Sequence, residues 1–289
     1  MLARYVLLGA VVLVAGCQSA PDRPSGAQAG QSYASTATTE DPRYAAIVVE
    51  AESGKVLHAV NADQLRYPAS LSKMMTLYVL FEEMESGRLG PNSPLHVSAR
   101  AAGQPPSKLG LKAGSIISVA DAIPGIAVKS GNDVAAVVAE NISGSEAAFA
   151  ERMTRTAHRI GMQNTIFRNA SGLPDPAQMT TARDMAILVR ALQQRFPRFY
   201  PVFSQRTFAY QGRTYPSTNK LLGKVSGLDG VKTGYIRASG YNLATSVRRS
   251  GERLVLVVFG GPTGAARDAH VTALVDEYLP ERRSWLAFR

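Results

Sequence analysis

The stretch YPASLSKMMTLYVL, residues 67–80, contains the start of the most apolar helical pattern in the chain. Nine of the fifteen residues from Ser70 to Met84 are apolar or aromatic, which predicts a helix buried in the core. Lys73 nevertheless lies in the first turn of this helix, three residues after Ser70. Because a buried ammonium group is unfavourable unless it is paired or neutral, this lysine calls for a chemical explanation.

Strand signals lie at both ends of the chain, on either side of a mainly helical middle. Residues 45–60, AAIVVEAESGKVLHAV, predict a β-hairpin with its turn at Glu52-Ser53-Gly54. Further strands are predicted at residues 228–235, 241–248 and 253–260, followed by a helix at 264–278. The pattern predicts an α+β fold, in which one antiparallel sheet is formed from both chain ends with flanking helices, plus an inserted all-helical subdomain at about residues 90–224. The cleft between the two parts is the expected place for a site.

The N-terminus predicts export. Residues 1–16 have the pattern of a signal peptide, because their apolar run from Tyr5 to Ala15 is too short to span a bilayer. The following Cys17 is the only cysteine, so no intramolecular disulfide can form. Residues 14–17, VAGC, resemble a bacterial lipobox, which implies that Cys17 is lipidated and that residues 17–41 form a flexible, small and polar tether. We therefore expect a protein on the periplasmic side of the envelope, anchored to a membrane by its N-terminal lipid. Gln18 favours the outer membrane; an ordinary signal peptide with an unmodified cysteine is the alternative.

The overall charge narrows the classes of partner. The formal net charge is +10, but the Lys and Arg residues are scattered, with no basic run interleaved with aromatics, so we do not expect nucleic-acid binding. No His-Glu-x-x-His motif, cysteine cluster or Gly-x-x-x-x-Gly-Lys-Ser/Thr loop occurs. We expect no metal and no cofactor.

Ser70 and Lys73 form a candidate nucleophile and base. Positions three apart on a helix lie on one face, so the two side chains can touch. A serine hydroxyl needs a base to take its proton, and lysine serves only if burial or a second cation lowers its pKa. Ser217 and Lys220 have the same spacing, but they lie in a polar loop rather than an apolar helix, and we discount them.

Two further triplets accompany this pair. Ser130-Gly131-Asn132 lies between two apolar helices, where we expect Gly131 to break the helical path. Lys232-Thr233-Gly234 lies at the end of a predicted strand. Each triplet alone is a weak turn signal, whereas all three motifs in this order and context are hard to assign to chance.

With these motifs in place, residues 42–279 resemble the penicillin-recognising serine D,D-peptidases of the β-lactamase-like superfamily, specifically the low-molecular-mass D-alanyl-D-alanine carboxypeptidases. The segments PASLSKMMT, SGNDVA, TTARDMA, LDGVKTGY and SGYNLATS carry the resemblance. It implies a catalytic domain at 42–279 that removes the terminal D-Ala from peptidoglycan stem peptides ending in D-Ala-D-Ala, through an acyl-enzyme. It also implies covalent inhibition by β-lactam antibiotics.

The resemblance assigns roles by position. Ser70 would be the acylated nucleophile, Lys73 its general base, and Ser130 a proton relay to the leaving amine. Asn132 would bind the substrate amide and help to hold Lys73. Lys232 and Thr233 would hold the terminal carboxylate, and Lys232 would help to keep Lys73 neutral. Gly234 and Tyr235 would line the strand that accepts the peptide, with the backbone N–H groups of Ser70 and Tyr235 as the oxyanion hole.

Three alternatives remain. A D,D-endopeptidase cutting peptidoglycan crosslinks would use the same residues. A β-lactamase needs a carboxylate for deacylation, typically a Glu, and residues 162–184 contain none. A penicillin-binding lipoprotein without turnover is disfavoured by the intact motifs. Many relatives carry a further β-rich domain and an amphipathic anchor; here we expect only a short basic tail at 280–289.

Overall fold

The computed structural model describes residues 41–281. The predicted signal peptide, the lipidation site at Cys17, the tether up to residue 40 and the tail from residue 282 lie outside the described residues. The predictions made for those segments therefore stay predictions.

The sheet is formed from both ends of the described chain, as predicted. Its five strands are antiparallel and have the order β2-β1-β9-β8-β7. Their bounds are β1 Ala45–Glu50, β2 Val56–Val60, β7 Leu228–Ile236, β8 Gly240–Arg249 and β9 Glu252–Gly261. Because β7 is last in this order and pairs only with β8, its second edge is available to a ligand.

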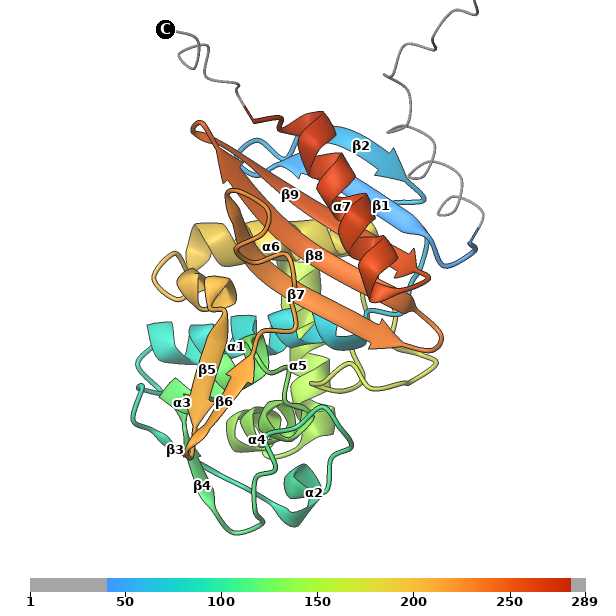
Figure 1. Ribbon diagram of the computed structural model, residues 1–289. Coiled ribbons are helices and arrows are strands. Elements are labelled where there is room, and N and C mark those ends of the chain that lie inside the picture. Colours follow the sequence, from blue (N-terminus) through green and yellow to red (C-terminus); the bar gives the residue numbers. More distant parts are fainter. Residues whose placement is uncertain (1–40, 282–289) are drawn as a thin grey trace, which may run out of the picture.

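Both faces of the sheet are covered, which explains why its central strands are apolar without alternation. In β1, Ile47 and Val49 belong to the core on one face, and Ala46 and Val48 to the core on the other. Helix α6 (Ala182–Arg195) packs on the first face, and α7 (Gly264–Tyr278) on the second (Figure 1).

The inserted region at about 90–224 is mainly helical, but the prediction that it is all-helical is wrong. It contains α2 Ala99–Ala102, α3 Val119–Ala127, α4 Asn132–Ser143 and α5 Glu146–Arg159, together with α6 and the 3₁₀ turn η2 Tyr200–Ser204. It also contains two two-stranded ribbons, β3 Pro94–His96 with β4 Ile116–Ser118, and β5 Thr207–Tyr210 with β6 Arg213–Pro216. These strands are only three or four residues long, too short for alternation to identify them. Helix α6 packs on the sheet, and its buried face contacts β1 and β9.

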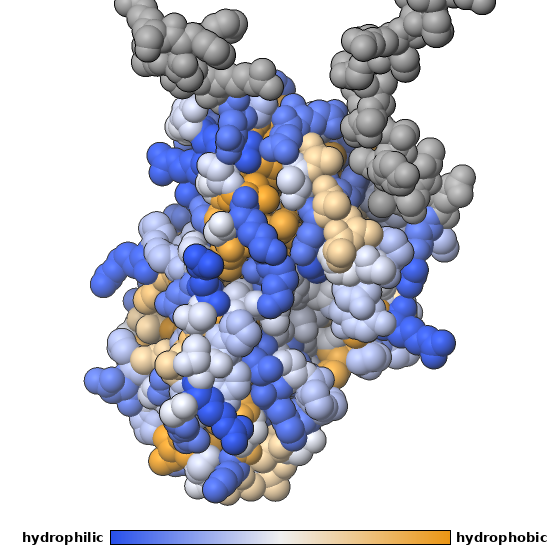
Figure 2. All heavy atoms as spheres, in the orientation of Figure 1, coloured by the Kyte–Doolittle hydropathy of each residue, from blue (hydrophilic) through white to orange (hydrophobic). Residues whose placement is uncertain are grey.

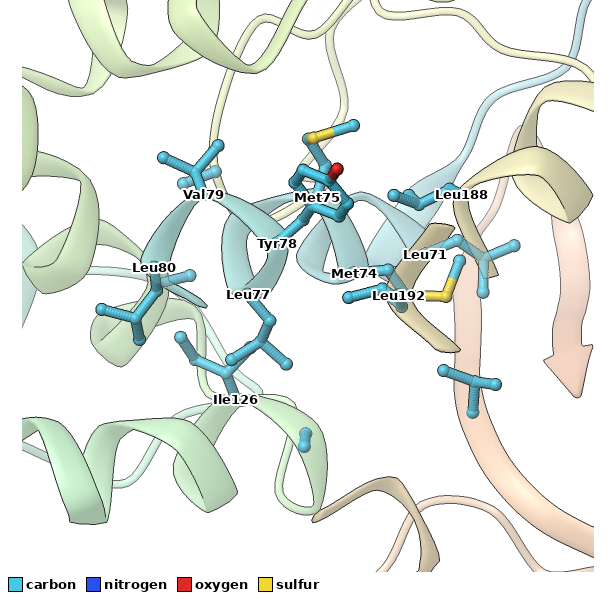
Figure 3. Packing of buried hydrophobic residues seen from close by; sticks show 14 of the residues in the cluster. Leu71, Met74, Met75, Leu77, Tyr78, Val79, Leu80, Ile126, Leu188 and Leu192 are labelled. Atoms are coloured by element: carbon cyan, nitrogen blue, oxygen red, sulfur yellow. The ribbon is translucent and has the colours of Figure 1, made fainter. Parts of the chain in front are cut away.

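Helix α1 (Lys73–Glu85) is the core of the molecule, as the apolar pattern predicts. Ten of its thirteen residues are buried, and they include Lys73. Figure 3 shows Leu77 above Ile126 of α3, and Leu188 and Leu192 of α6 beside the start of α1. Ser70 lies just before this helix, in the 3₁₀ turn η1 (Ala69–Ser72), rather than in its first α-turn. In a 3₁₀ turn residues three apart are eclipsed, so the predicted contact between Ser70 and Lys73 is preserved.

The face of the molecule drawn in Figure 2 is largely hydrophilic, with apolar side chains in separate patches. Within residues 41–281, no helix combines the length and the apolar character needed to cross a membrane.

Candidate active site

A cleft of about 690 Å³ lies between the free edge of β7 and the helical region. Of the eight predicted catalytic and binding residues, six line it: Ser70, Ser130, Asn132, Thr233, Gly234 and Tyr235. The other two, Lys73 and Lys232, are 0% and 1% exposed. The structure thus brings three motifs, which are spread over residues 70–234 of the sequence, to one cleft.

The amine of Lys73 joins two of the motifs. Its Nζ lies 3.1 Å from Ser70 Oγ and donates to Asn132 Oδ1 at 2.7 Å and to the Ser171 carbonyl at 2.5 Å. The Asn132 amide is oriented by its Nδ2, which donates to the Pro105 carbonyl at 2.9 Å. The carbonyl-type oxygen of Asn132 is therefore the atom that faces the lysine.

The electrostatics favour a neutral Lys73. Burial lowers the pKa of Lys73 well below its usual 10.5, and the nearby charge of Lys232 lowers it further. Asp133 and Glu146 oppose this shift in pKa with smaller effects. Burial in the apolar helix and the nearby Lys232 are thus the two causes that lower the pKa of Lys73.

Asp133 and Glu146 serve as anchors for loops around the cleft. The Asp133 carboxylate accepts hydrogen bonds from the backbone N–H groups of Leu109, Gly110 and Leu111, at 3.1, 2.8 and 3.1 Å. Glu146 accepts from the N–H of Ala170 at 2.9 Å and pairs with Arg100. Each carboxylate holds a segment that contributes to the cleft wall, and neither is among the residues lining it.

The Ser130 motif breaks the helical path between α3 and α4, as predicted. Gly131, at the N-cap position of α4, is extended, with φ −61° and ψ 119°. The strained residue of the motif is Ser130, which has φ +64°. Ala69, next to Ser70, also has a positive φ of +48°. Non-glycine residues rarely adopt this conformation, and such strain is concentrated at functional sites.

The loop containing Ser171 and Gly172 closes the cleft beneath Ser70. A Cβ on Gly172 would lie 1.8 Å from the Ala69 carbonyl oxygen, and Gly172 has φ +81°. Only glycine permits this approach, which places the Ser171 carbonyl within reach of Lys73. The loop is held by Asn169 Oδ1, which accepts from the N–H groups of Gly172 at 2.7 Å and Leu173 at 3.1 Å.

The strand β7 passes close to η1. A Cβ on Gly234 would lie 3.1 Å from the Pro68 carbonyl and 3.3 Å from the Leu71 nitrogen. Such contacts are tighter than ordinary packing allows, so a larger residue at 234 would push the strand away from Ser70. Tyr235, 53% exposed, follows at the cleft mouth and its ring centroid lies 4.3 Å from that of Tyr241.

Thr233 lines the far wall of the cleft, and Lys232 is buried next to it. Burial, with a smaller effect from the Arg267 guanidinium, lowers the pKa of Lys232 to about 7. Its Nζ donates to the Thr233 carbonyl at 3.0 Å, and Thr233 Oγ1 donates to Thr218 Oγ1 at 2.8 Å.

The polar residues of this cleft that the sequence motifs did not identify include Ser171, Thr218, Lys220 and Arg267. Ser171 acts through its carbonyl, which no side-chain pattern reveals. Arg267 is buried in α7, where it donates to the Asn242 carbonyl at 2.9 Å and pairs with Asp268 at 2.7 Å. The signal for it in the sequence is an arginine near the start of the helix predicted at 264–278. Across residues 41–281, no cluster of three or more His, Cys, Asp or Glu side chains could hold a metal ion.

The fold and the cleft resemble those of serine peptidases of the penicillin-binding type, and comparisons with known proteins agree. The family model described as D-alanyl-D-alanine carboxypeptidase matches residues 32–263, so the chain belongs to this family. It is 33% identical over 235 residues to D-alanyl-D-alanine carboxypeptidase DacF of Bacillus subtilis, and 36% identical over 246 residues to DacC of Escherichia coli. These alignments cover 80% and 82% of this chain, and 60% and 62% of the relatives. The chain thus spans about three-fifths of the length of these curated relatives.

Solved structures give the same grouping. Penicillin-binding protein 5 from Haemophilus influenzae superposes with a TM-score of 0.78 at 36% identity, covering 81% of this chain and 69% of that chain. Penicillin-binding protein D2 from Listeria monocytogenes, in its ampicillin-bound form, has a TM-score of 0.70 at 30% identity and covers 80% and 95%. These neighbours confirm the α+β fold class.

Proposed function

We propose that this chain is a serine D-Ala-D-Ala carboxypeptidase that removes the terminal D-Ala from peptidoglycan stem peptides. The observation that carries the proposal is the buried Lys73 amine, which lies between Ser70 Oγ and Asn132 Oδ1 at the floor of the cleft. The catalytic domain is assigned to residues 42–279.

The contacts of Lys73 support its role as a base. A neutral amine has two hydrogens and one lone pair. Two of its three partners, Asn132 Oδ1 and the Ser171 carbonyl, are oxygens that only accept, so they take the two hydrogens. The lone pair is then directed to the remaining partner, the Ser70 hydroxyl, whose proton it can remove.

Acylation follows from this arrangement. As Lys73 takes the Ser70 proton, Oγ attacks the carbonyl carbon between the two D-Ala residues. The backbone N–H groups of Ser70 and Tyr235 stabilise the oxyanion, because β7 holds Gly234 against η1 and so keeps Tyr235 close to the nucleophile. Ser130 relays this proton from Lys73 to the leaving nitrogen, the C–N bond breaks, and free D-Ala departs. Water then hydrolyses the Ser70 ester and returns the proton to the hydroxyl.

A β-lactam would follow the same path as far as the ester. Among the described residues that line the cleft, one carries a carboxylate, Asp268. This carboxylate forms a salt bridge with Arg267. Glu146 and Asp133 are committed to backbone amides. Because no free carboxylate faces Ser70 within this lining, the penicilloyl ester lasts, and the protein is inhibited by penicillin rather than acting as a β-lactamase.

The test is a pair of assays on the purified chain. We expect release of D-Ala from a peptide ending in D-Ala-D-Ala, and stable covalent labelling by a fluorescent penicillin, both abolished by Ser70→Ala. Labelling that survives Ser70→Ala would overturn the assignment. Rapid loss of label with penicillin hydrolysis would indicate a β-lactamase, and labelling without release from any fragment would indicate a binding protein. A crosslinked dimeric muropeptide in the same assay measures endopeptidase activity.

The proposed location is the periplasmic side of the envelope, with Cys17 lipidated and the outer membrane as the favoured site. The support is the N-terminal sequence, in which an apolar run is followed by VAGC at 14–17. Radiolabelled palmitate should be incorporated into the full chain and not into Cys17→Ser. A Cys17→Ser protein that fractionates with the membrane as the full chain does would refute the lipid anchor.

A further inference from the structure

The segment that supplies the Ser171 carbonyl to Lys73 is held on two sides. The Ala170 N–H donates to Glu146 Oε1 at 2.9 Å, and the Ala170 carbonyl accepts from Thr76 Oγ1 at 2.6 Å. Thr76 is buried in α1, three residues after Lys73, and Glu146 lies in the first turn of α5. The two contacts therefore fix the backbone directly before the carbonyl that accepts from the Lys73 amine.

Glu146 is held in turn by a residue that does not line the cleft. Its Oε2 pairs with the guanidinium of Arg100 in α2, and that guanidinium also lies 3.1 Å from Glu140 Oε1. The Arg100 side chain is 55% exposed, and with His96 it lines a groove of about 630 Å³ that shares no residue with the cleft. The Lys73 amine is thus connected, through protein contacts, to an arginine in another groove of the molecule.

The charges around Lys73 give this connection a chemical consequence. Lys232 of β7 lowers the pKa of Lys73, whereas Asp133 of α4 and Glu146 of α5 raise it and so favour the ammonium form. Asp133 is bound by three backbone N–H groups, and Glu146 has the cation of Arg100 against it. Because the fields of two close opposite charges largely cancel at a distance, the pair holds the loop without keeping Lys73 protonated.

We propose that Arg100 is a positioning residue for the base: it neutralises Glu146, so that this carboxylate fixes the Ser171 loop while Lys73 stays free to accept a proton. The inference rests on the proposed function, in which Lys73 takes the proton of Ser70. Arg100 does not line the cleft, so it acts on the reaction through Glu146.

The experiment measures the rate of labelling by a fluorescent penicillin as a function of pH. The midpoint of this profile reports the loss of the Lys73 proton, and the plateau reports the rate with the neutral base. Arg100→Ala leaves the Glu146 carboxylate without its cation, so the midpoint should rise by about half a pH unit. Below the midpoint, labelling should then be about threefold slower than in the wild type. Arg100→Lys keeps a cation and should keep the wild-type midpoint.

A second arm removes the carboxylate. Glu146→Gln keeps an oxygen that accepts from the Ala170 N–H but carries no charge, so its midpoint should not exceed that of the wild type. Adding Arg100→Ala in this background should leave the midpoint unchanged, because no carboxylate remains to be neutralised. The matched control is Arg155→Ala: Arg155 is an exposed arginine of α5, paired with Glu151, and it lines neither the groove nor the cleft. It should change neither midpoint nor plateau.

Three outcomes overturn the inference and leave the proposed function intact. The first is an Arg100→Ala protein with the wild-type midpoint, because a lower plateau alone indicates a structural role. The second is an equal shift in the Glu146→Gln background, since Arg100 would then act without the carboxylate. The third is a shift that disappears when His96→Gln is added, because the titrating group would be His96.

Two results with the wild type reach further. A labelling rate that does not change with pH overturns both the role of Lys73 as the base and this inference. A wild type that neither releases D-Ala nor takes the label overturns the proposed function and this inference with it.

Discussion

The chain contains two Ser-x-x-Lys stretches at one cleft, and they differ in everything except spacing. At 70–73 the lysine is fully buried at the start of the core helix and touches its serine. At 217–220 the lysine is exposed, and it contacts the serine's backbone carbonyl rather than its hydroxyl. Lys73 has a strongly lowered pKa, because it is desolvated and lies near Lys232.

The comparison shows that spacing permits a reaction and the environment decides whether it occurs. Desolvation makes Lys73 a proton acceptor, since the charged form is unfavourable in the core. Lys220 is exposed and its Nζ does not reach the Ser217 hydroxyl, so it lacks both the burial and the serine contact that Lys73 has. The same two residue types at the same spacing thus form a candidate nucleophile and base in one place only.

The largest expected difference between the two stretches is at the serines. Ser70→Ala should lower the rate of penicillin labelling by at least about a thousandfold, because no hydroxyl remains to form the ester. Ser217→Ala should label within about threefold of the wild type, since it loses one hydroxyl that accepts from the Asn219 N–H at 3.2 Å. Gel fluorescence after timed labelling measures both. An equal loss of labelling rate in the two variants would show that the two serines do not differ in function.

The next effect is at the first lysine. Lys73→Met removes the base but keeps an apolar chain of similar length, so it should fold and acylate at least about a hundredfold more slowly. In the wild type, the acylation rate should rise with pH as Lys73 loses its proton and level off well below pH 10.5, because the pKa of Lys73 is lowered. Stopped-flow labelling across pH gives the profile. A rate still climbing at pH 10.5 would mean an ordinary lysine at this position.

A glycine behind the first stretch gives a third test. Gly172→Ala places a Cβ 1.8 Å from the Ala69 carbonyl, so the loop must move and withdraw the Ser171 carbonyl from Lys73. We expect a loss of about 3 kcal/mol or more in unfolding free energy and labelling slowed by about thirtyfold. Gly87→Ala is the matched control: it has a similar φ of +74° but nothing within 4 Å of the added atom. It should cost about 1 kcal/mol, from backbone strain alone, and leave labelling unchanged. Similar losses in the two variants would show that strain, and not the close approach to Ala69, governs Gly172.

The fold and the central residues of the site could be predicted because their signals are local. The apolar run after Ser70 and the strands at both chain ends each reflect neighbouring residues. The Ser171 carbonyl, the loop at Thr218 and the buried Arg267 could not, because their roles arise from contacts between residues 15 to 98 apart in sequence. The strain at Ser130 also escaped prediction, since a neighbouring glycine was the more usual candidate for a break in the helix.

The smallest expected effect compares a buried and an exposed lysine through the stability of the fold. The pKa of Lys232 is lowered to about 7 in the folded protein, while the unfolded chain keeps the usual value of 10.5. Between these values the unfolded chain binds more protons than the folded one, so stability rises with pH, by up to about 1.4 kcal/mol per pH unit from this group. Below about pH 7 the penalty of burying the charge is fully present.

Lys232→Met should therefore show a flatter rise in unfolding free energy from pH 7 to 10 than the wild type, with Lys73 still contributing in the same direction. Lys220→Met is the matched control: it removes an exposed lysine and leaves Lys232 and Lys73 in place, so it should follow the wild-type slope. Urea unfolding at a series of pH values measures the slopes, and a Lys232→Met slope equal to that of the wild type would show that Lys232 stays charged in the folded protein.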